Sequence, residues 1–189
     1  MKKASPSLTE TPHKNQIRSI LREQRDALTA ERREEALHAL TADLLPLLQS
    51  FNTILSFHSL PQEIDLTPIN KLLAEEGKLL LPKVDGEQLR AYRVVDLASL
   101  VASTWKILEP NPSLCECVDL QTIDCILVPG LGFDANRHRI GYGKGHYDRL
   151  IAQCKQAPKT IGIGFKEQHC EKSFPVESHD IRLEEIRLF

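Results

Sequence analysis

Apolar residues in the first quarter of the chain recur at every third or fourth position, which predicts helices. The first helix begins at Thr11 and Pro12, because a threonine hydroxyl caps a helix and proline is tolerated at its first position. Its apolar side carries Ile17, Ile20, Leu21 and Leu28. Residues 1–12 are polar and have little to bury, so we expect a flexible tail ahead of one domain that spans residues 13–189.

The same spacing predicts two further helices. The second follows an N-cap at Thr29 and has a kink or an end at Pro46. Its regularly spaced leucines are Leu37, Leu40, Leu44, Leu47 and Leu48. The third lies within residues 65–77, where Gly77 provides the stop.

Short, mostly apolar runs predict the strands of a sheet. Four such runs cover residues 53–57, 78–82, 123–129 and 159–165. A turn at Asp85 and Gly86 predicts an antiparallel edge strand after it, and residues 181–189 are a candidate for another edge. Residues 94–122 show little periodicity, so we expect a short helix near 96–101 and otherwise a loop.

A helix over residues 145–156 lies between two of these strands, so residues 123–165 have the pattern of a βαβ unit. The continuous apolar run at 123–129 is typical of a parallel strand that is covered on both faces. Strands that alternate with helices predict an α/β fold. We expect a three-layer sandwich, whose mainly parallel central sheet is flanked by helices.

The composition is that of an ordinary globular domain, with 41% hydrophobic and 26% charged residues. The net charge of -2 excludes a bulk attraction to nucleic acid, so any anion must be held by local clusters. No segment approaches the ~20 apolar residues that span a bilayer, and the start lacks a signal-peptide core, so we expect a cytoplasmic protein without a membrane partner. Five cysteines in no regular framework fit reduced thiols.

The most informative segment is 129–148, which leaves the carboxyl end of a core strand and enters a helix. Open α/β sheets bind ligands at that end. Three alternating glycines let backbone amides approach phosphate oxygens, and the helix start adds partial positive charge. These glycines are Gly141, Gly143 and Gly145. Arg139 and Lys144 supply cations. A surface turn explains many glycine-rich loops, but here glycines, cations, a preceding strand and a following helix occur together, which favours phosphate binding.

Two runs in this segment resemble the signature of the 5-formyltetrahydrofolate cyclo-ligase family, also called methenyltetrahydrofolate synthetases. They are VPGLGFD, which begins at Val128, and RIGYGKGHYDR, which begins at Arg139. The resemblance covers nearly the whole chain and includes Lys14 with Arg18, Gln62 to Ile64, Leu81 with Pro82, Glu109 with Pro110, and His179 with Asp180. It implies a NagB/RpiA/CoA-transferase-like fold.

The resemblance implies that ATP and Mg²⁺ are used to convert 5-formyltetrahydrofolate into 5,10-methenyltetrahydrofolate, ADP and phosphate, through a phosphorylated formyl intermediate. Phosphoryl transfer depends on positioning and on neutralising oxygens, so Arg139 and Lys144 are the candidate catalytic residues. The candidate ATP-binding residues are Lys14, Arg18, Arg139, Gly141, Tyr142, Gly143, Lys144, Gly145, His146 and Tyr147. The expected partners are a reduced folate and ATP, and the expected assembly is a monomer or weak dimer.

The resemblance also implies a metal site and a folate site. Asp148 and Asp180 match positions associated with Mg²⁺, an ion that prefers hard oxygen ligands. The alternative is that Asp148 favours the first turn of a helix and Asp180 is an exposed loop carboxylate. Glu63 matches an acid that accepts hydrogen bonds from the pterin. The other candidate folate contacts are His58, Trp105, Tyr142 and Tyr147, although a lone tryptophan more often packs in a core.

Three positions depart from the family pattern. His146 stands where an aromatic residue is expected, Gly132 where alanine is usual, and His58 where an apolar residue is common. Two other functions are compatible with the residues. A non-catalytic regulator binds folate or nucleotide without releasing ADP, and a sugar-phosphate isomerase or CoA-transferase-like enzyme turns over a phosphorylated metabolite without ATP.

Overall fold

The computed structural model describes residues 14–103 and 107–189, and its centre is a seven-stranded sheet. The strands are β1 (Ile54–Leu55), β2 (Leu79–Asp85), β3 (Gln88–Arg93), β6 (Glu116–Val118), β7 (Cys125–Pro129), β10 (Lys159–Gly164) and β12 (Glu185–Leu188). They lie in the order β12-β10-β7-β1-β2-β3-β6. Strands β12 to β2 are parallel, whereas β3 and β6 extend one edge antiparallel. The mainly parallel sheet that was predicted is confirmed.

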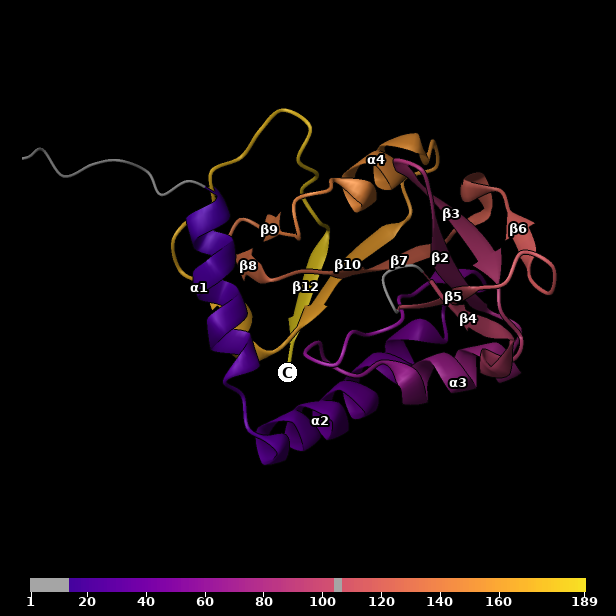
Figure 1. Cartoon of the computed structure of the whole chain (residues 1–189), viewed down its shortest axis with the longest axis horizontal. Coiled ribbons are helices and arrows are strands. Elements are labelled where there is room, and N and C mark those ends of the chain that lie inside the picture. Colours follow the sequence, from indigo (N-terminus) through magenta and orange to yellow (C-terminus); the bar gives the residue numbers. More distant parts are fainter. Residues whose placement is uncertain (1–13, 104–106) are drawn as a thin grey trace, which may run out of the picture.

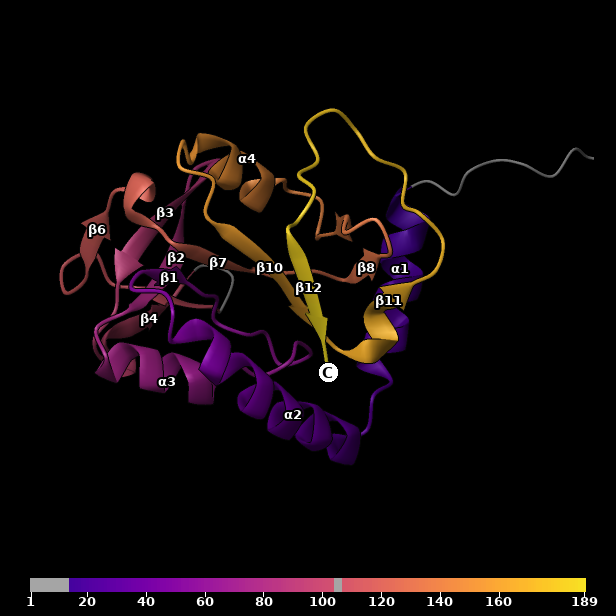
Figure 2. The same ribbon diagram turned by 180° about the vertical axis from the view of Figure 1, so that it is seen from behind.

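Helices cover both faces of this sheet: α2 (Ala30–Leu48) and α3 (Thr67–Glu75) on one face, and α4 (His146–Gln153) on the other (Figures 1 and 2). Helix α1 (Lys14–Asp26) stands at the side of the molecule. Successive residues of a strand point to opposite faces. Leu79 and Leu127 accordingly share a core cluster with α2 and α3, whereas Leu80 and Ile126 share another with Leu150 of α4. The sandwich therefore has a helical layer on each side.

The predictions of helix starts, ends and buried faces are confirmed in part. Thr29 caps α2 as predicted, since its hydroxyl accepts a hydrogen bond from the backbone N–H of Arg32 at 3.2 Å. Pro46 does not end α2, which continues to Leu48. Ile20, placed on the apolar side of the first helix, is 54% exposed, so that assignment is wrong. The predicted tail and the cap at Thr11 lie outside the described residues.

The predicted loop at 129–148 is partly a small sheet. Strand β8 (Gly132–Asp134) pairs antiparallel with β9 (Arg139–Ile140) and parallel with β11 (His169–Cys170). Helix α1 packs on this sheet through an apolar cluster around Leu21 and Ile140. A Cβ at Gly132 would lie 2.6 Å from Cδ1 of Leu21, so the glycine that departs from the family pattern brings α1 close to β8.

Residues 94–122 contain structure that sequence periodicity did not reveal. A 3₁₀ turn at Leu97–Ser99 replaces the helix expected near 96–101, and β4 (Leu100–Ala102) pairs with β5 (Leu108–Pro110). Strand β6 completes the edge of the main sheet. Strands of three residues are too short to show a sustained alternation, which explains why the segment was expected to be a loop.

The βαβ unit predicted at 123–165 is confirmed, because β7 and β10 are parallel neighbours and α4 lies between them in the chain. The β8–β9 hairpin is inserted just before α4. This hairpin carries the glycine-rich segment to the carboxyl end of β7. Among the helices of the described residues, none is both long enough and apolar enough to cross a membrane.

Candidate functional site

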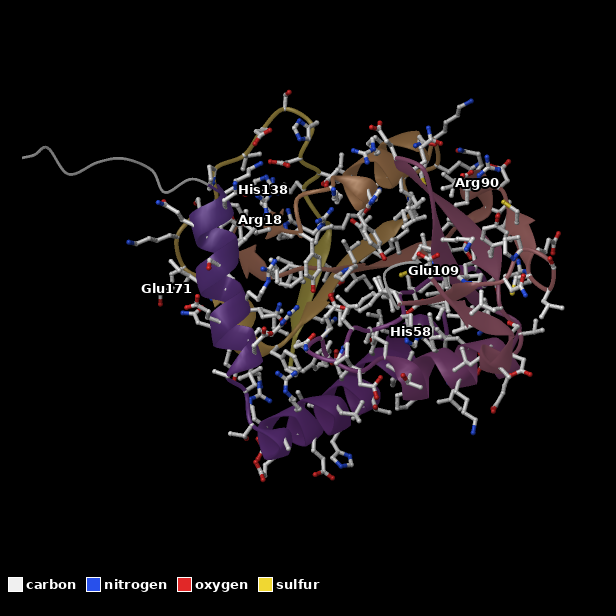
Figure 3. All side chains as sticks on the ribbon, viewed as in Figure 1. Arg18, His58, Arg90, Glu109, His138 and Glu171 are labelled. Carbon is white, nitrogen blue, oxygen red and sulfur yellow. The ribbon has the colours of Figure 1, made fainter. Side chains whose placement is uncertain are left out.

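A cleft of about 380 Å³ lies at the carboxyl ends of β1 and β7, where Phe57, His58 and Pro129 form part of its wall. In Figure 3, Arg18 approaches from α1, whereas His58 and Glu109 lie on the side of the central strands. Every candidate residue that the structure describes lines this cleft: Lys14, Arg18, His58, Glu63, Arg139, Gly141, Tyr142, Gly143, Lys144, Gly145, His146, Tyr147, Asp148 and Asp180. Trp105 lies outside the described residues.

Left-handed backbone shapes the glycine-rich segment. Gly143 has φ +96 and Gly145 has φ +62, values that L side chains rarely adopt. Gly145 occupies the N-cap position of α4, so the backbone turns directly from the segment into the helix. Nε of Arg18 donates to the carbonyl of Gly141 at 2.9 Å and ties the segment to α1. The positive end of α4 thus faces the cleft.

Lys14 reaches across the cleft to two carboxylates. Its Nζ lies 2.6 Å from Oδ2 of Asp180 and 2.8 Å from Oε1 of Glu177. Desolvation opposes the charge of Lys14, but these two bonds prevail and raise its pKa. Burial is likewise the largest single influence on Asp180 and acts to raise its pKa, but the hydrogen bonds from Lys14 and from the backbone N–H of Glu177, together with the charge of Lys14, outweigh burial and lower that pKa. Both groups are therefore charged at neutral pH.

Arg139 and Asp148 form a second ion pair in the cleft. The guanidinium lies 2.9 Å from Oδ2 of Asp148, and the two side chains are only 7% and 13% exposed. The backbone N–H of Ile181 donates to Oδ1 of Asp148 at 3.2 Å, which brings Asp180 beside Asp148. By contrast, the exposed side chain of Lys144 makes no hydrogen bond or ion pair with any residue that the structure describes.

Glu63 lies in a hydrogen-bonded cluster with backbone and tyrosine donors. Its Oε1 accepts from the hydroxyl of Tyr142 at 2.7 Å, and its Oε2 accepts from the backbone N–H of Leu60 at 2.9 Å. Burial raises the pKa of Glu63, and it also raises the pKa values of Tyr142 and Tyr147. Desolvation lowers the pKa of His58, which is neutral at pH 7. This part of the cleft is therefore suited to neutral N–H donors.

His146 contacts the turn between β2 and β3. Its Nδ1 lies 3.1 Å from the carbonyl oxygen of Glu87, which also accepts two hydrogen bonds from Arg149. A phenylalanine at position 146 has no nitrogen for such a bond. The departure from the family pattern therefore has a structural consequence, since it connects the start of α4 to the β2–β3 hairpin.

Two residues of the site were missed by the sequence reasoning. Arg25 donates to the hydroxyl of Tyr142 at 2.7 Å, and Glu177 pairs with Lys14. Arg25 lies seven positions after Arg18, a spacing that places both side chains on one helical face and is a usable signal. Glu177 has no comparable signal, because only the folded loop brings it back to α1.

Comparisons with known proteins place the chain in one family. The profile of the 5-formyltetrahydrofolate cyclo-ligase family matches residues 10–188. A 5-formyltetrahydrofolate cyclo-ligase of Mus musculus is 30% identical over 194 residues, covering 95% of this chain and 95% of that protein. A protein of the same name from Escherichia coli K12 is 29% identical, over 87% of this chain and 93% of its own length.

Solved structures give the same fold. The NMR structure of a 5,10-methenyltetrahydrofolate synthetase from Aquifex aeolicus is 30% identical and has a TM-score of 0.77, covering 92% of this chain and 88% of that one. A 5,10-methenyltetrahydrofolate synthetase from Mycoplasma pneumoniae has a TM-score of 0.74 over 92% of this chain and 96% of its own. At 22% identity the second likeness supports the fold alone.

Proposed function

Because this chain belongs to the 5-formyltetrahydrofolate cyclo-ligase family and is a ligase of that class, we propose that it uses ATP and Mg²⁺ to close 5-formyltetrahydrofolate into 5,10-methenyltetrahydrofolate. ADP and phosphate are the other products. The observation that carries this proposal is the single cleft lined by Lys14, Glu63 and the segment 139–148. These segments are far apart in the sequence, and the fold brings them to one cleft.

The chemistry explains why ATP is needed. The formyl oxygen is amide-like and a poor leaving group, so transfer of the γ-phosphoryl group to it activates the formyl carbon. N10 of the folate then forms a bond to that carbon, the C–O bond breaks, and the oxygen leaves as part of phosphate while N10 loses its proton. No covalent bond to the protein is required, so the enzyme contributes positioning and charge neutralisation.

The phosphate side of the cleft, which we define as Lys14, Arg139, Lys144, Asp148 and Asp180, supports this chemistry. The ammonium group of Lys144 has no hydrogen-bond or ion-pair partner among the described residues, so it is available to a phosphate oxygen. Lys14 and Arg139 are paired with carboxylates, and they exchange these partners when a triphosphate enters. The amides between positions 141 and 145 line the cleft and supply further donors.

Asp148 and Asp180 fit a magnesium ion that is bound mainly by phosphate. Mg²⁺ usually takes one or two carboxylates, several waters and substrate phosphates. The two aspartates are adjacent, because the residue after Asp180 donates to Asp148. No group of three or more His, Cys, Asp or Glu side chains within residues 14–103 and 107–189 has the arrangement of a metal site. When bound, the ion neutralises charge that develops on the transferring phosphoryl group.

The folate side, which we define as His58, Glu63 and Tyr142, supports recognition of the pterin. An ionised carboxylate has about four lone-pair positions, of which Tyr142 and Leu60 take two. The remaining positions can accept the amino and ring N–H groups of the pterin. His58 and Tyr142 also line the cleft. Trp105, which lies outside the described residues, is a further candidate folate contact from the sequence.

The decisive experiment mixes the purified protein with 5-formyltetrahydrofolate, Mg²⁺ and ATP. We expect the absorbance of methenyltetrahydrofolate to rise in step with ADP release, and we expect no rise when ATP is omitted. Binding of both ligands without ADP release would instead favour a regulator. Turnover of a phosphorylated metabolite without ATP would favour an isomerase or a CoA-transferase-like enzyme.

A further inference from the structure

Arg25 is a buried cation behind the folate side of the cleft. Its side chain is 3% exposed, and it lies near the end of α1 without lining the cleft. A buried arginine is costly unless its N–H groups find acceptors. One of these groups donates to the hydroxyl of Tyr142 at 2.7 Å, and two others reach Oδ1 of Asp26 at 3.1 and 3.2 Å. The contact with Tyr142 connects α1 with the glycine-rich segment.

The direction of these hydrogen bonds fixes one proton. A guanidinium group only donates, so the oxygen of Tyr142 accepts from Arg25. The hydroxyl proton of Tyr142 must then point to Oε1 of Glu63, 2.7 Å away. The backbone N–H of Leu60 holds the other carboxylate oxygen. Both oxygens of Glu63 are thus acceptors, an arrangement that favours the ionised carboxylate, because in the protonated form one oxygen is a hydroxyl that accepts more weakly and needs an acceptor for its own proton.

We propose that Arg25 is a positioning residue that, through the hydroxyl of Tyr142, holds Glu63 ready as an ionised acceptor for the reduced folate. This inference rests on the proposed function, and it adds a residue on α1 to the recognition of the folate. Arg25 does not take a lone pair of Glu63 for itself, because the tyrosine stands between them. Both free positions of the carboxylate stay available to the ligand.

The charges around Glu63 support this role. Burial raises the pKa of Glu63, and the charge of Arg25 acts against that rise. The other titratable groups around it are Tyr142 from the glycine-rich segment and Tyr147 from α4, and His58 lines the same cleft. From α2, Arg33 donates to the carbonyl oxygens of Gln62 and Arg25 at 3.0 and 2.8 Å, so its guanidinium lies against the backbone on this side of the cluster.

Loss of Arg25 leaves the hydroxyl of Tyr142 free to rotate. Its oxygen can then accept a hydrogen bond from the O–H group of a protonated Glu63, so protonation of Glu63 is no longer opposed. Folate binding requires the ionised form, and the KM for folate therefore rises as the pH falls through the pKa of Glu63. In Arg25→Met this rise occurs at higher pH than in the wild type, by about one pH unit.

The test measures the KM for 5-formyltetrahydrofolate between pH 5.5 and 8.5 in Arg25→Met, Tyr142→Phe and the double variant. We expect each single variant to raise the KM about tenfold near neutral pH and much less at pH 8.5. The double variant should be no worse than Tyr142→Phe, because the tyrosine carries the effect. Arg25→Lys, which keeps a charged donor, should recover part of the loss. Arg22→Met, at an exposed position of the same helix, is the matched control.

Three results would overturn the inference. Losses that multiply in the double variant would mean that Arg25 and Tyr142 act separately. A loss that is equal at all pH values would mean that Arg25 only packs α1. If Arg25→Met does not fold, Tyr142→Phe must still show the shifted profile, and an unshifted profile contradicts the role of the tyrosine. If the wild-type protein neither binds nor converts folate, the proposed function fails together with this inference. If the wild type is active and only the variants behave otherwise than expected, the inference alone fails.

Discussion

On the phosphate side of the cleft, Lys14 and Arg139 are each bound directly by an aspartate, at 2.6 and 2.9 Å. On the folate side, Glu63 meets the cation Arg25 only through the hydroxyl of Tyr142. A direct ion pair must break before its cation can hold a phosphate oxygen, whereas the tyrosine leaves lone pairs of the carboxylate free. Under the proposed function, the phosphate side must therefore rearrange when ATP arrives, whereas the folate side is already arranged.

Lys144 is the exception on the phosphate side. Its ammonium group has no partner among the described residues, although it lies in the wall of the same cleft. An unpaired surface lysine is well hydrated and costs the fold little. We infer that Lys144 makes the first contact with the nucleotide, and that Lys14 and Arg139 follow by exchanging their carboxylate partners.

The largest expected effect is that of Lys144→Ala. Removal of a cation that stabilises a transferring phosphoryl group lowers kcat/KM for ATP on the order of 10²–10³-fold. The KM for folate should change less than twofold, and the melting temperature should not change, because the side chain makes no contact that the fold uses. Lys155→Ala, at another exposed lysine, is the control. Equal losses of ATP use and folate binding in a folded variant would contradict the separation of the two sides.

The next effect in size is that of Glu63→Gln, which should weaken folate and spare ATP. Glutamine keeps the shape, but its amide has a single oxygen, and the NH₂ group that replaces the other oxygen only donates. Either Tyr142 or Leu60 therefore loses its acceptor, and an N–H group now faces the pterin. We expect the KM for folate to rise about 30-fold, as for loss of hydrogen bonds to a charged group. Glu75→Gln, at an exposed position of α3, is the control. An unchanged KM for folate would remove Glu63 from the site.

How much of this site was visible in the sequence depends on how local each feature is. The segment 139–148 was predicted because its glycines, cations and aspartate are contiguous, and the structure brings all of them to the cleft. Lys14, Glu63 and Asp180 were predicted only through the family resemblance, and the structure places all three in the wall of the cleft. Their residue types alone are compatible with solvated surface charges, because nothing in their own neighbourhood indicates what they face in the fold.

The features that were missed depend on tertiary contacts. Arg25 is an ordinary charged residue of α1 until the helix packs on the small sheet, which buries it against Tyr142. The hairpin inserted between β7 and α4 escaped prediction because β8 and β9 span three and two residues. Strands β4, β5 and β6 are equally short. The long core strands, by contrast, were predicted because their apolar runs are continuous.

The smallest expected effect concerns stability, and it has opposite signs on the two sides. Burial acts to raise the pKa of Asp180, but Lys14 lowers it, so ionised Asp180 stabilises the fold. That contribution is complete above the ordinary aspartate pKa of ~3.9 and is lost as the pH falls through the lowered value. Asp180→Asn should therefore lower the free energy of unfolding by about 1 kcal/mol at pH 7. The difference from the wild type should disappear in acid.

Glu63 provides the opposite case, because burial raises its pKa and its ionisation costs stability. Stability from neutral Glu63 is present below its unfolded pKa of ~4.3 and is lost as the pH rises through the raised folded value. Glu63→Gln should consequently be as stable as the wild type, or more stable, at pH 7, while it binds folate poorly. Urea unfolding of both variants, at pH 7 and at a pH below the lowered pKa of Asp180, measures the sign of each effect. A loss of stability in Glu63→Gln at pH 7 would show that its hydrogen bonds to Tyr142 and Leu60 outweigh the cost of burying the charge, and that the folate side, like the phosphate side, contributes to holding the fold together.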